Sequence, residues 1–450
     1  MSTTFGTDGI RGVANSQLRP EIALALGRAA ARHLGETAFL VGRDTRQSGP
    51  MLLAAFCAGV TAEGFDVIDV GVIPTPGLAW LGAKHRLPVA MISASHNPFG
   101  DNGIKLFGPG GSKLSSDEER VIEQDLNALL KGEEVSLLPV PTGRGVGTII
   151  SDSGQVSDYI DDLENSVNLD GTRRLHVVVD CANGAASALA PQLFSRFNLK
   201  LSFIANTPDG TNINDHCGAT SPHLLAQTVV REHADLGISF DGDADRLIAC
   251  DGEGVLVNGD VLLALFAFDL DLRNLLEKRT VAVTVMSNLG LRRALTERGI
   301  EVVETAVGDR NVTDAMEEHS IVLGGEQSGH VVFRRQTLIG DGLLSGLKLI
   351  ELCAHSKQTL SELAKGAMTA IPQVIRNVVV DDLRLLDNHP QIFIVAKEIE
   401  ESLGEWGRVF IRASGTEPKI RIMVEAEDEA KVRSVVEELV RLVERAMAIT

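Results

Sequence analysis

Acidic residues alternate with small ones in FDGDADR, residues 240–246. The glycine and alanine spacers let the backbone curl, so the carboxylates of Asp241, Asp243 and Asp245 can converge. At a separation of about 4 Å and an effective dielectric constant of about 20, each pair would repel by roughly 4 kcal/mol. The spacing therefore predicts a bound cation, and ligands that are all oxygen indicate Mg²⁺ or Ca²⁺.

The calcium alternative can be checked against the EF-hand loop. That loop needs glycine at its sixth position and glutamate at its twelfth, where this sequence has Arg246 and Gly252. Apolar runs precede and follow the acidic residues, at 236–240 and 247–250, which favours a built site over a solvated acidic turn. Three protein ligands would leave Mg²⁺ free to take a phosphate oxygen.

A serine stands at the end of another apolar run. Residues Val89–Ile92 predict a strand that is buried on both faces, and SASHNP follows directly. Ser95 could be a nucleophile, a phosphate carrier or part of a turn. It has no glycine neighbour, as a hydrolase elbow would, and His96 makes a poor base because adjacent residues at a strand end tend to point apart. A phosphoserine, with about −1.5 to −2 charges, would supply a further ligand to the cation.

For Ser93 and His96 themselves, turn hydrogen bonds are the favoured interpretation. Three basic residues in glycine-containing loops could bind the phosphate. They are Arg11 in TDGIRG, Lys105 in NGIK and Arg246 directly after the acidic triplet. Each alone is more often a surface charge. Their placement beside the proposed ligands favours a role in the site.

Two further loops suit a phosphorylated sugar. Glu326 and Ser328 alternate between glycines in GGEQSGH, residues 324–330, which suits contacts to neighbouring hydroxyls, although an ordinary turn explains so short a motif equally well. RASGTEPKIR, residues 412–421, reads as a phosphate cradle, with Arg412 for a two-pronged contact. A solvent-facing hairpin loop is the alternative. The other cradle residues are Ser414, Gly415 and Thr416.

Three segments must position these loops. Beginning at Ala38, Leu175 and Thr280, each reads as strand, polar turn, helix and strand, which predicts a sheet with parallel neighbours. After each segment an apolar strand runs into one of the polar loops, and ligands in such sheets bind beyond the carboxyl ends of strands. We therefore expect three similar α/β domains with mixed sheets around a central cleft.

The last 80 or so residues depart from this plan and predict a separate α+β domain. It has a helix at 391–403, strands at 408–412 and 419–425, and a helix at 429–447. The expected domains are 1–152 with the serine loop, 153–254 with the metal loop, 255–368 with the sugar loop, and 369–450 with the phosphate loop.

Composition excludes several classes of protein. Hydrophobic residues make up 44% and charged ones 23% of 450 residues, as in an ordinary globular protein. The net charge of −19, without a basic block, argues against nucleic acid or an anionic membrane as the partner. Five scattered cysteines without CxxC spacing fit reduced thiols in the cytoplasm, and neither a signal peptide nor a membrane span is expected.

These motifs together resemble the α-D-phosphohexomutase superfamily along the whole chain. The matching stretches are SASHNP, DGDADR, GEQSGH and RASGTEPKIR, in that order. FGTDGIRG at the start, VGDR at 307–310 and GGEQSGH are most similar to the branch that acts on glucosamine phosphates. The phosphomannomutase/phosphoglucomutase branch usually differs at the opening and at VGDR, and it remains the alternative.

The resemblance implies four domains around a cleft and a phosphorylated Ser95 in the resting enzyme. Ser95 would give its phosphate to O1 of glucosamine 6-phosphate and take one back from O6 of the bisphosphate, in a step towards UDP-N-acetylglucosamine and cell-wall precursors. It also implies Mg²⁺ as cofactor and a hexosamine or hexose 1,6-bisphosphate as activator. A Ser/Mg-dependent sugar-phosphate phosphatase and a non-catalytic Ca²⁺ module remain as rival classes.

The same resemblance assigns roles to single residues. Arg11, Lys105 and Arg246 would serve catalysis, with Lys105 as general base or acid, and Ser95 and the three aspartates would hold the metal. Glu326 and Ser328 would hold sugar hydroxyls, while His330 would contact the substrate or be structural. Asp309 is assigned to the amino group from its charge alone, and a loop-capping role is at least as good. The distal phosphate would bind Arg412, Ser414, Gly415, Thr416 and Arg421. The partner is a small sugar phosphate, and the chain a monomer or homodimer.

Overall fold

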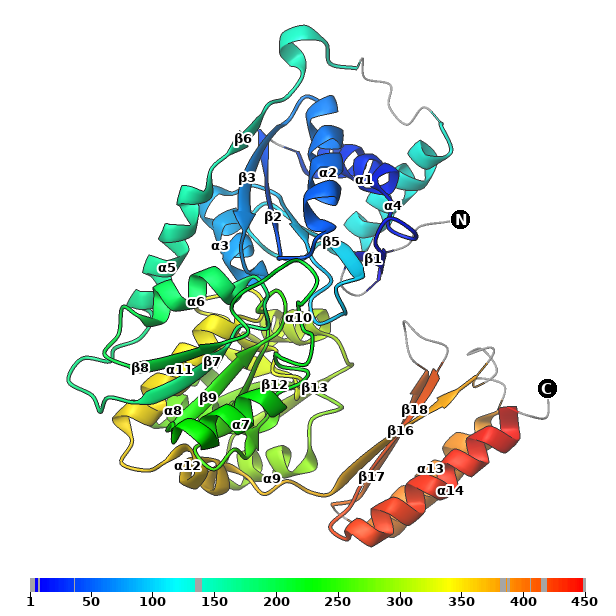
Figure 1. The fold of residues 1–450 in the computed structure, drawn as a ribbon. Coiled ribbons are helices and arrows are strands. Elements are labelled where there is room, and N and C mark those ends of the chain that lie inside the picture. The colour runs from blue at the N-terminus through cyan, green and yellow to red at the C-terminus, as the bar shows by residue number, and fades with distance from the viewer. Residues whose placement is uncertain are drawn as a thin grey trace. The chain divides into compact units, whose positions relative to one another are not determined.

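Three mixed sheets repeat one strand order in the larger part of the chain (Figure 1). In the first sheet the order is β1 (Ile10–Val13), β5 (Asp101–Phe107), β4 (Val89–Ile92), β2 (Ala38–Arg43), β3 (Asp66–Val72) and β6 (Ile149–Ser151). The second runs β11 (Leu256–Val257), β10 (Leu247–Asp251), β9 (Leu236–Phe240), β7 (His176–Asp180) and β8 (Lys200–Ile204). The third runs β13 (Glu301–Thr305), β12 (Thr280–Thr284), β14 (Leu323–Gly325) and β15 (Val331–Phe333).

The same three strands deliver the predicted loops. β4, β9 and β14 each pair parallel with the first strand of their segment and antiparallel with the strand that follows their loop. Equivalent strand ends are therefore followed by the serine loop (residues 93–100), the acidic loop (241–246) and the sugar loop (326–330). The prediction of three similar α/β units with mixed sheets is confirmed.

This computed structural model describes residues 5–6, 9–35, 37–133, 140–380, 386, 389–404, 406–413 and 419–447. The chain forms two compact units: Met1–Met286 with Ile300–Ala367, and Ser287–Gly299 with Met368–Thr450. The helix of the third segment, α9 (Leu289–Glu297), thus belongs to the smaller unit. The reason is visible at its start, where the Asn288 side chain pairs with the backbone of Ile371 and the Leu289 N–H donates to Glu425.

The helices of the larger unit are amphipathic or largely apolar, according to how much of their surface is buried. They are α1 (Pro20–Leu34), α2 (Gly49–Ala62), α3 (Thr75–His85), α4 (Ser116–Leu130), α5 (Val156–Asn165), α6 (Ala186–Phe194), α7 (His223–Glu232), α8 (Gly259–Leu272), α10 (Asp309–His319), α11 (Gly342–His355) and α12 (Leu360–Ala367). Short 3₁₀ turns lie at Gly143–Gly145, Ser153–Gln155 and Glu277–Arg279.

Two glycines let α1 and α2 pack in direct backbone contact. A Cβ on Gly27 would lie 2.2 Å from the Phe56 carbonyl oxygen, and one on Gly59 would lie 2.1 Å from that of Leu24. The first sheet and this helix pair enclose a core that includes the fully buried Phe39 and Phe56. The core gives the loops at the sheet edge a rigid base.

The smaller unit is the α+β domain that the sequence predicts. Its antiparallel sheet has the order β16 (Gln373–Val379), β18 (Lys419–Glu425) and β17 (Arg408–Ala413), and it packs with α13 (Pro390–Leu403) and α14 (Glu429–Met447). All four predicted elements are confirmed to within a residue at each end.

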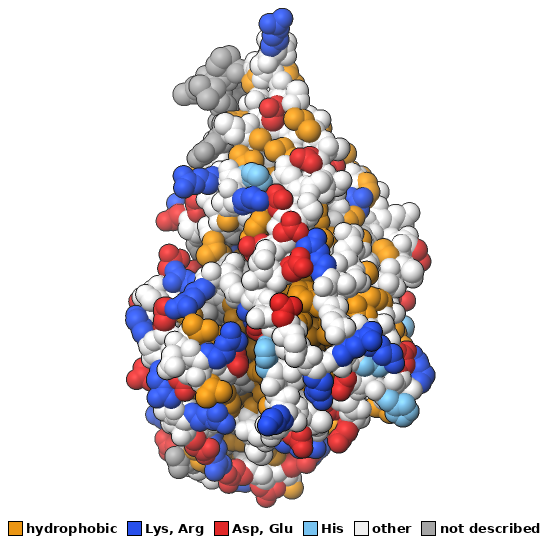
Figure 2. Space-filling view, turned by 90° about the vertical axis from the view of Figure 1, so that its left-hand side faces the viewer, with side chains coloured by type: hydrophobic (Ala, Val, Ile, Leu, Met, Phe, Trp, Pro, Cys, Tyr) orange, Lys and Arg blue, Asp and Glu red, His pale blue; other side chains and the backbone are white. Residues whose placement is uncertain are grey.

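Two findings concern the surface. On the face drawn in Figure 2, acidic and basic side chains are interspersed, and no large basic patch stands out. Among the described helices, none combines the length and the apolar composition that a bilayer crossing needs.

Candidate active site

Ser95 joins the serine loop to the acidic loop. It lies fully buried at the end of β4, and its Oγ donates a 2.5 Å hydrogen bond to Asp241 Oδ2. Its backbone is in the left-handed region, with φ at 51°, and its N–H donates to Ser93 Oγ at 2.9 Å. The structure thus brings together the serine and the acidic residues, which are 146 positions apart in sequence.

The three aspartates converge as their spacing predicts. One ligand oxygen from each lies within 4.8 Å of the others, and all three residues are buried. A positive φ of 57° at Ala244 provides the backbone curl. Gly242 is required by close packing, because a Cβ there would lie 2.5 Å from the Ser95 carbonyl oxygen.

Positive charge reaches this cluster from two sides. Lys105 Nζ lies 2.7 Å from Asp243 Oδ2 and 3.5 Å from Asp245 Oδ2. The Arg246 backbone N–H donates to Asp241 Oδ1 at 3.2 Å, and its Nε lies 3.8 Å from Asp245 Oδ1. Thr75 Oγ1 also donates to Asp243 Oδ2, at 2.6 Å.

The acidic cluster fits a hard divalent cation. Burial raises the pKa of Asp241 well above its usual value, and the neighbouring charges of Asp245 and Asp243 raise it further. Among the described residues no group donates a hydrogen bond to the buried Asp245 Oδ1. Convergent oxygens with incomplete partners and mutual repulsion are what Mg²⁺ would stabilise.

His96 lies closer to Ser95 than the sequence predicts. The two side chains do not point apart, because His96 Nδ1 is 3.4 Å from Ser95 Oγ; that prediction is wrong. The left-handed backbone at Ser95 turns both side chains to the same side of the loop. Burial, together with the positive charges of Arg246 and Arg11, lowers the pKa of His96 to about 4, so the ring is neutral at pH 7.

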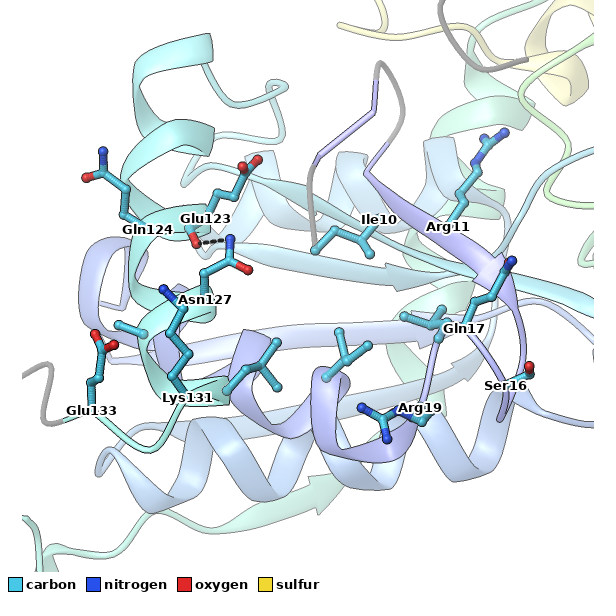
Figure 3. A pocket seen from close by; sticks show the side chains of 14 residues that line it. Ile10, Arg11, Ser16, Gln17, Arg19, Glu123, Gln124, Asn127, Lys131 and Glu133 are labelled. Atoms are coloured by element: carbon cyan, nitrogen blue, oxygen red, sulfur yellow. Dashed lines mark hydrogen bonds between the residues drawn. The ribbon is translucent and has the colours of Figure 1, made fainter. Parts of the chain in front are cut away.

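Arg11 lies on β1 and is the cross-strand partner of Gly103 on β5. Lys105 is two residues further along β5. It borders a cavity of about 1230 Å³ between β1, α1 and α4. Figure 3 shows its guanidinium pointing away from Glu123 and Asn127, the side chains that α4 presents to that cavity. Its charge instead acts on His96, beside Ser95.

The sugar loop is held against the acidic loop. The Leu247 N–H, at the start of β10, donates to the Gly329 carbonyl at 2.9 Å, and Gly308 N–H donates to Glu326 Oε1 at 3.2 Å. Ser328 is exposed at the loop tip. Glu326 and Ser328 therefore differ in setting, one tied to the start of α10 and the other open to solvent.

His330 and Asp309 lie side by side in this region. His330 is buried, and its Nε2 accepts the Gly340 N–H at 3.1 Å, which leaves the ring proton on Nδ1. Asp309 Oδ2 lies 3.8 Å from that Nε2 and accepts the ammonium group of Lys113. The Asp309 Oδ1 also accepts the N–H of Arg310 at 2.7 Å, within the first turn of α10.

The candidate phosphate clamp lies in the smaller unit. Arg412 on β17 and Arg421 on β18 are direct cross-strand partners. Like charges in this position repel, which an anion between them would relieve. Ser414, Gly415 and Thr416 lie outside the described residues.

Sequence reasoning missed Asp44, Arg46 and Asn214. The first two stand in GRDTRQ, directly after β2, so their signal was a polar run at the carboxyl end of the strand next to β4. All three contact the serine loop, as Asp44 binds Ser93 and the other two bind the Ser95 carbonyl. Their contacts depend on tertiary structure, so no local pattern identifies their partners.

Four family models match the chain in order. They describe phosphoglucomutase/phosphomannomutase alpha/beta/alpha domains I (residues 2–132), II (157–254) and III (258–371) and the C-terminal domain (376–442). Among solved structures, a phosphoglucomutase/phosphomannomutase family protein from Burkholderia thailandensis is 26% identical, with a TM-score of 0.83 over 99% of this chain and 98% of that one.

A more distant likeness shows the fold alone. N-acetylphosphoglucosamine mutase from Aspergillus fumigatus, solved in complex with GlcNAc-6P and magnesium, is 18% identical, with a TM-score of 0.70 over 99% of this chain and 96% of that one.

Curated relatives are much more similar in sequence. The phosphoglucosamine mutase of Desulforamulus reducens is 45% identical over 448 residues, which cover 98% of this chain and 99% of that protein. The phosphoglucosamine mutase of Listeria monocytogenes is 45% identical over 455 residues, with 100% of both chains covered. With this identity along its whole length and all four domains matched in order, the chain belongs to the phosphoglucosamine mutase family of the α-D-phosphohexomutase superfamily.

Proposed function

We propose that this enzyme interconverts glucosamine 6-phosphate and glucosamine 1-phosphate through a phosphorylated Ser95. One observation carries the proposal: Ser95 Oγ lies 2.5 Å from Asp241 in a buried cluster of three convergent carboxylates. The full-length relatives named phosphoglucosamine mutase support the sugar, since 45% identity extends over the whole chain. Its product would feed the supply of UDP-N-acetylglucosamine and cell-wall precursors.

The reaction consists of two phosphoryl transfers. In the first, the bond from phosphorus to Ser95 Oγ breaks and a bond to O1 of glucosamine 6-phosphate forms, while O1 loses its proton and Oγ gains one. In the second, Oγ loses its proton and takes the phosphoryl group from O6 of the bisphosphate, and O6 gains a proton. Such transfers depend mainly on positioning and on neutralisation of charge.

The chain's own groups suit these tasks. Lys105 Nζ, within 2.7 Å of Asp243, is placed to exchange a proton at the reacting oxygens. Arg11 and Arg246 act as fixed positive charges beside Ser95, since both lower the pKa of the adjacent His96. When held by phosphorylated Ser95 and the three aspartates, Mg²⁺ would supply charge neutralisation at the transferring group.

The sugar would lie against the loop of residues 326–330. Glu326 and Ser328 are proposed to bind hydroxyls, and the Nδ1–H of His330 is a buried donor that lacks an acceptor among the described residues. Arg412, Ser414, Gly415, Thr416 and Arg421 are proposed to hold the phosphate that does not react. A hexosamine or hexose 1,6-bisphosphate would rephosphorylate an enzyme that has lost its phosphate.

The proposal has further parts at the level of the whole protein. The enzyme is placed in the cytoplasm as a monomer or homodimer that binds neither nucleic acid nor membrane. Domains divided near residues 152, 254 and 368 are supported by family matches that end or begin close to these positions.

The test uses purified protein with Mg²⁺, glucosamine 6-phosphate and a trace of glucose 1,6-bisphosphate, followed by ³¹P NMR. We expect glucosamine 1-phosphate, and intact-mass analysis should show one phosphoryl group that maps to Ser95. Ser95→Ala should abolish both, while Ser157→Ala, at an exposed serine on α5, should change neither. Inorganic phosphate as the main product would indicate a phosphatase, and phosphate mapped to Ser93 would refute the assignment.

Asp309 gives a test of sugar specificity. If its carboxylate binds the amino group of the substrate, Asp309→Asn should reduce the preference for glucosamine 6-phosphate over glucose 6-phosphate about tenfold or more, because a charged hydrogen bond contributes roughly 1.5–3 kcal/mol. Parallel kcat/KM measurements on glucosamine, glucose and mannose phosphates provide the readout. An unchanged ratio would leave Asp309 as a structural residue at the start of α10, paired with Lys113.

A further inference from the structure

Arg46 is a buried arginine whose five N–H groups are all used close to Ser95. Its side chain is 0% exposed, and its Nε donates to Asp44 Oδ2 at 2.8 Å. Its two terminal nitrogens donate to four backbone carbonyls of the serine loop: Ser95 (2.9 Å), Asn97 (2.8 Å), Asp101 (3.0 Å) and Pro98. A guanidinium has five N–H donors in one plane, and all five of them make hydrogen bonds in Arg46.

Asp44 extends the same network to the other side of Ser95. Its Oδ2 accepts the Ser93 hydroxyl at 2.7 Å, and its Oδ1 accepts the Arg46 N–H at 3.0 Å. Ser93 Oγ in turn accepts the Ser95 N–H at 2.9 Å. The peptide groups on both sides of the Ser95 Cα are therefore fixed, one through Ser93 and one through Arg46.

The loop between β8 and α7 contributes a matching contact. Asn214 Nδ2 donates to the Ser95 carbonyl at 2.9 Å and to that of Asn97 at 3.2 Å. The loop that carries Arg46 is itself tied to the same region, through Thr45 Oγ1 to the Asn183 carbonyl at 2.6 Å and Gln47 N–H to the Gly210 carbonyl at 2.9 Å. The Ser95 carbonyl also abuts Gly242 of the acidic loop.

This network stabilises a backbone conformation of Ser95 that is unfavourable by itself. A serine with φ at 51° is in a region that L-residues disfavour, and strain of this kind persists only where the surroundings enforce it. The left-handed backbone is what aims Oγ at Asp241 and places it beside His96. Relaxation of the loop would move the oxygen that exchanges the phosphoryl group.

We propose that Arg46 and Asp44 are positioning residues for phosphoryl transfer, which lock Ser95 in its left-handed conformation without touching substrate or metal. The inference rests on the proposed function, because it assumes that Ser95 Oγ carries the phosphate. It assigns the GRDTRQ segment a role in the rate of the chemical step. Arg46 serves this role through its planar fork, which a lysine cannot reproduce.

The test compares Arg46→Lys and Ser93→Ala with the unmodified enzyme. Arg46→Lys keeps the charge but has at most three donors. Ser93→Ala removes one hydroxyl, which accepts the Ser95 N–H and donates to Asp44. The readout is the single-turnover rate at which glucose 1,6-bisphosphate phosphorylates Ser95, followed by quenched-flow mass spectrometry. A misplacement of about 1 Å can cost about a hundredfold. We expect a loss of that order for Arg46→Lys and about tenfold for Ser93→Ala, with KM changed less than about threefold.

Arg32→Lys is the matched control. Arg32 lies in the last turn of α1, in the same α/β domain, and makes a two-pronged ion pair with Glu63 at 2.9 and 3.0 Å. It should lower the melting temperature without slowing phosphorylation per folded molecule. A merely structural Arg46 would behave like Arg32, with lowered stability and an unchanged rate.

The outcomes separate the two proposals. If the unmodified enzyme never phosphorylates Ser95, the proposed function fails. If it does so and both loop variants keep rates within about threefold while folded, the positioning role is refuted. Should Arg46→Lys fail to fold, Ser93→Ala decides alone, because it removes one hydroxyl and leaves the Arg46 contacts in place.

Discussion

Ser95 and the acidic triplet show how single residues oppose local preference to make a site. The serine takes a strained backbone, and three carboxylates share a buried space in which burial and mutual repulsion raise the pKa of Asp241. Lys105 and Arg246 offset part of that charge. The remaining repulsion makes the cluster a site whose stability depends on its cation.

Asp243→Asn tests that dependence, since it removes one charge and keeps an acceptor for Thr75 and Lys105. In the unmodified enzyme, Mg²⁺ at one hundred times its Kd should stabilise the fold by about 2.7 kcal/mol. The variant should lose most of this stabilisation together with phosphorylation of Ser95. Calorimetric titration and thermal melts with and without EDTA measure both.

Asp158→Asn, at an exposed position on α5, is the control and should keep the full Mg²⁺ effect. A variant of Asp243 that still bound Mg²⁺ with unchanged affinity would show that the triplet is not the metal site.

The elements place these residues through one repeated connection. In each of the three sheets, the strand before the polar loop lies between a parallel and an antiparallel neighbour, so the loop leaves at the carboxyl end of the first strand. The starts of helices also position polar side chains. Asp341 caps α11, where its Oδ1 accepts the Leu344 N–H at 2.9 Å, and its Oδ2 accepts the hydroxyl of Tyr159 on α5 at 2.8 Å.

This contact makes the α5–α11 junction sensitive to pH. Burial, with a smaller contribution from the charge of Asp162, raises the pKa of Asp341 from 3.8 to about 6, against the opposing hydrogen bonds of Leu344 and Tyr159. Because the folded pKa exceeds the unfolded value, the carboxyl stabilises the fold below about pH 3.8, and this contribution is lost as the pH rises through about 6. A shift of about two units corresponds to about 3 kcal/mol.

Asp341→Asn removes the titration and can satisfy both partners. Its advantage over the unmodified protein should therefore grow from about pH 4.5 to about pH 7, by about 2 kcal/mol in the free energy of unfolding. Trp80 is a local reporter, since its ring lies 6.1 Å from that of Tyr159, and Trp406→Phe removes the second indole. A constant difference between the two proteins across this range would contradict the raised pKa.

At the scale of the whole molecule, the chain divides the work between two compact units. The larger unit contains the serine, acidic and sugar loops. The smaller contains Arg412 and Arg421, which face each other across β17 and β18. Binding energy from a part of the substrate that does not react can orient the part that does.

Arg412→Ala separates the binding of the distal phosphate from the chemical step. Loss of a two-pronged charged contact, at about 1.5–3 kcal/mol per bond, should reduce kcat/KM by roughly ten- to a thousandfold. Mg²⁺ affinity should not change, and slow phosphorylation of Ser95 by added bisphosphate should persist. Steady-state kinetics and intact-mass analysis measure the two effects.

Arg376→Ala is the control in the same sheet, because Arg376 makes an exposed ion pair with Glu437 on α14. It should leave kcat/KM nearly unchanged. Normal kinetics in a folded Arg412→Ala enzyme would show that this arginine does not bind the distal phosphate.

By itself, the sequence determined the features that depend on neighbouring residues. Alternation of aspartates with small spacers predicted their convergence, and apolar runs predicted β4 and β9. The change of pattern after residue 368 predicted a separate α+β domain with β17, β18, α13 and α14. These predictions hold because backbone curl, strand burial and helix periodicity are set by residues a few positions apart.

Tertiary structure alone decided which distant side chains meet. The bond from Ser95 to Asp241 spans 146 positions, and the buried Arg46 lies 49 positions from the carbonyl of Ser95 that it binds. The left-handed turn that brings His96 to Ser95, and the contact of Asp309 with Lys113 and His330, are likewise absent from any local pattern. Such contacts arise from strand order, from register and from burial, because a buried guanidinium needs acceptors from the protein for all its N–H groups.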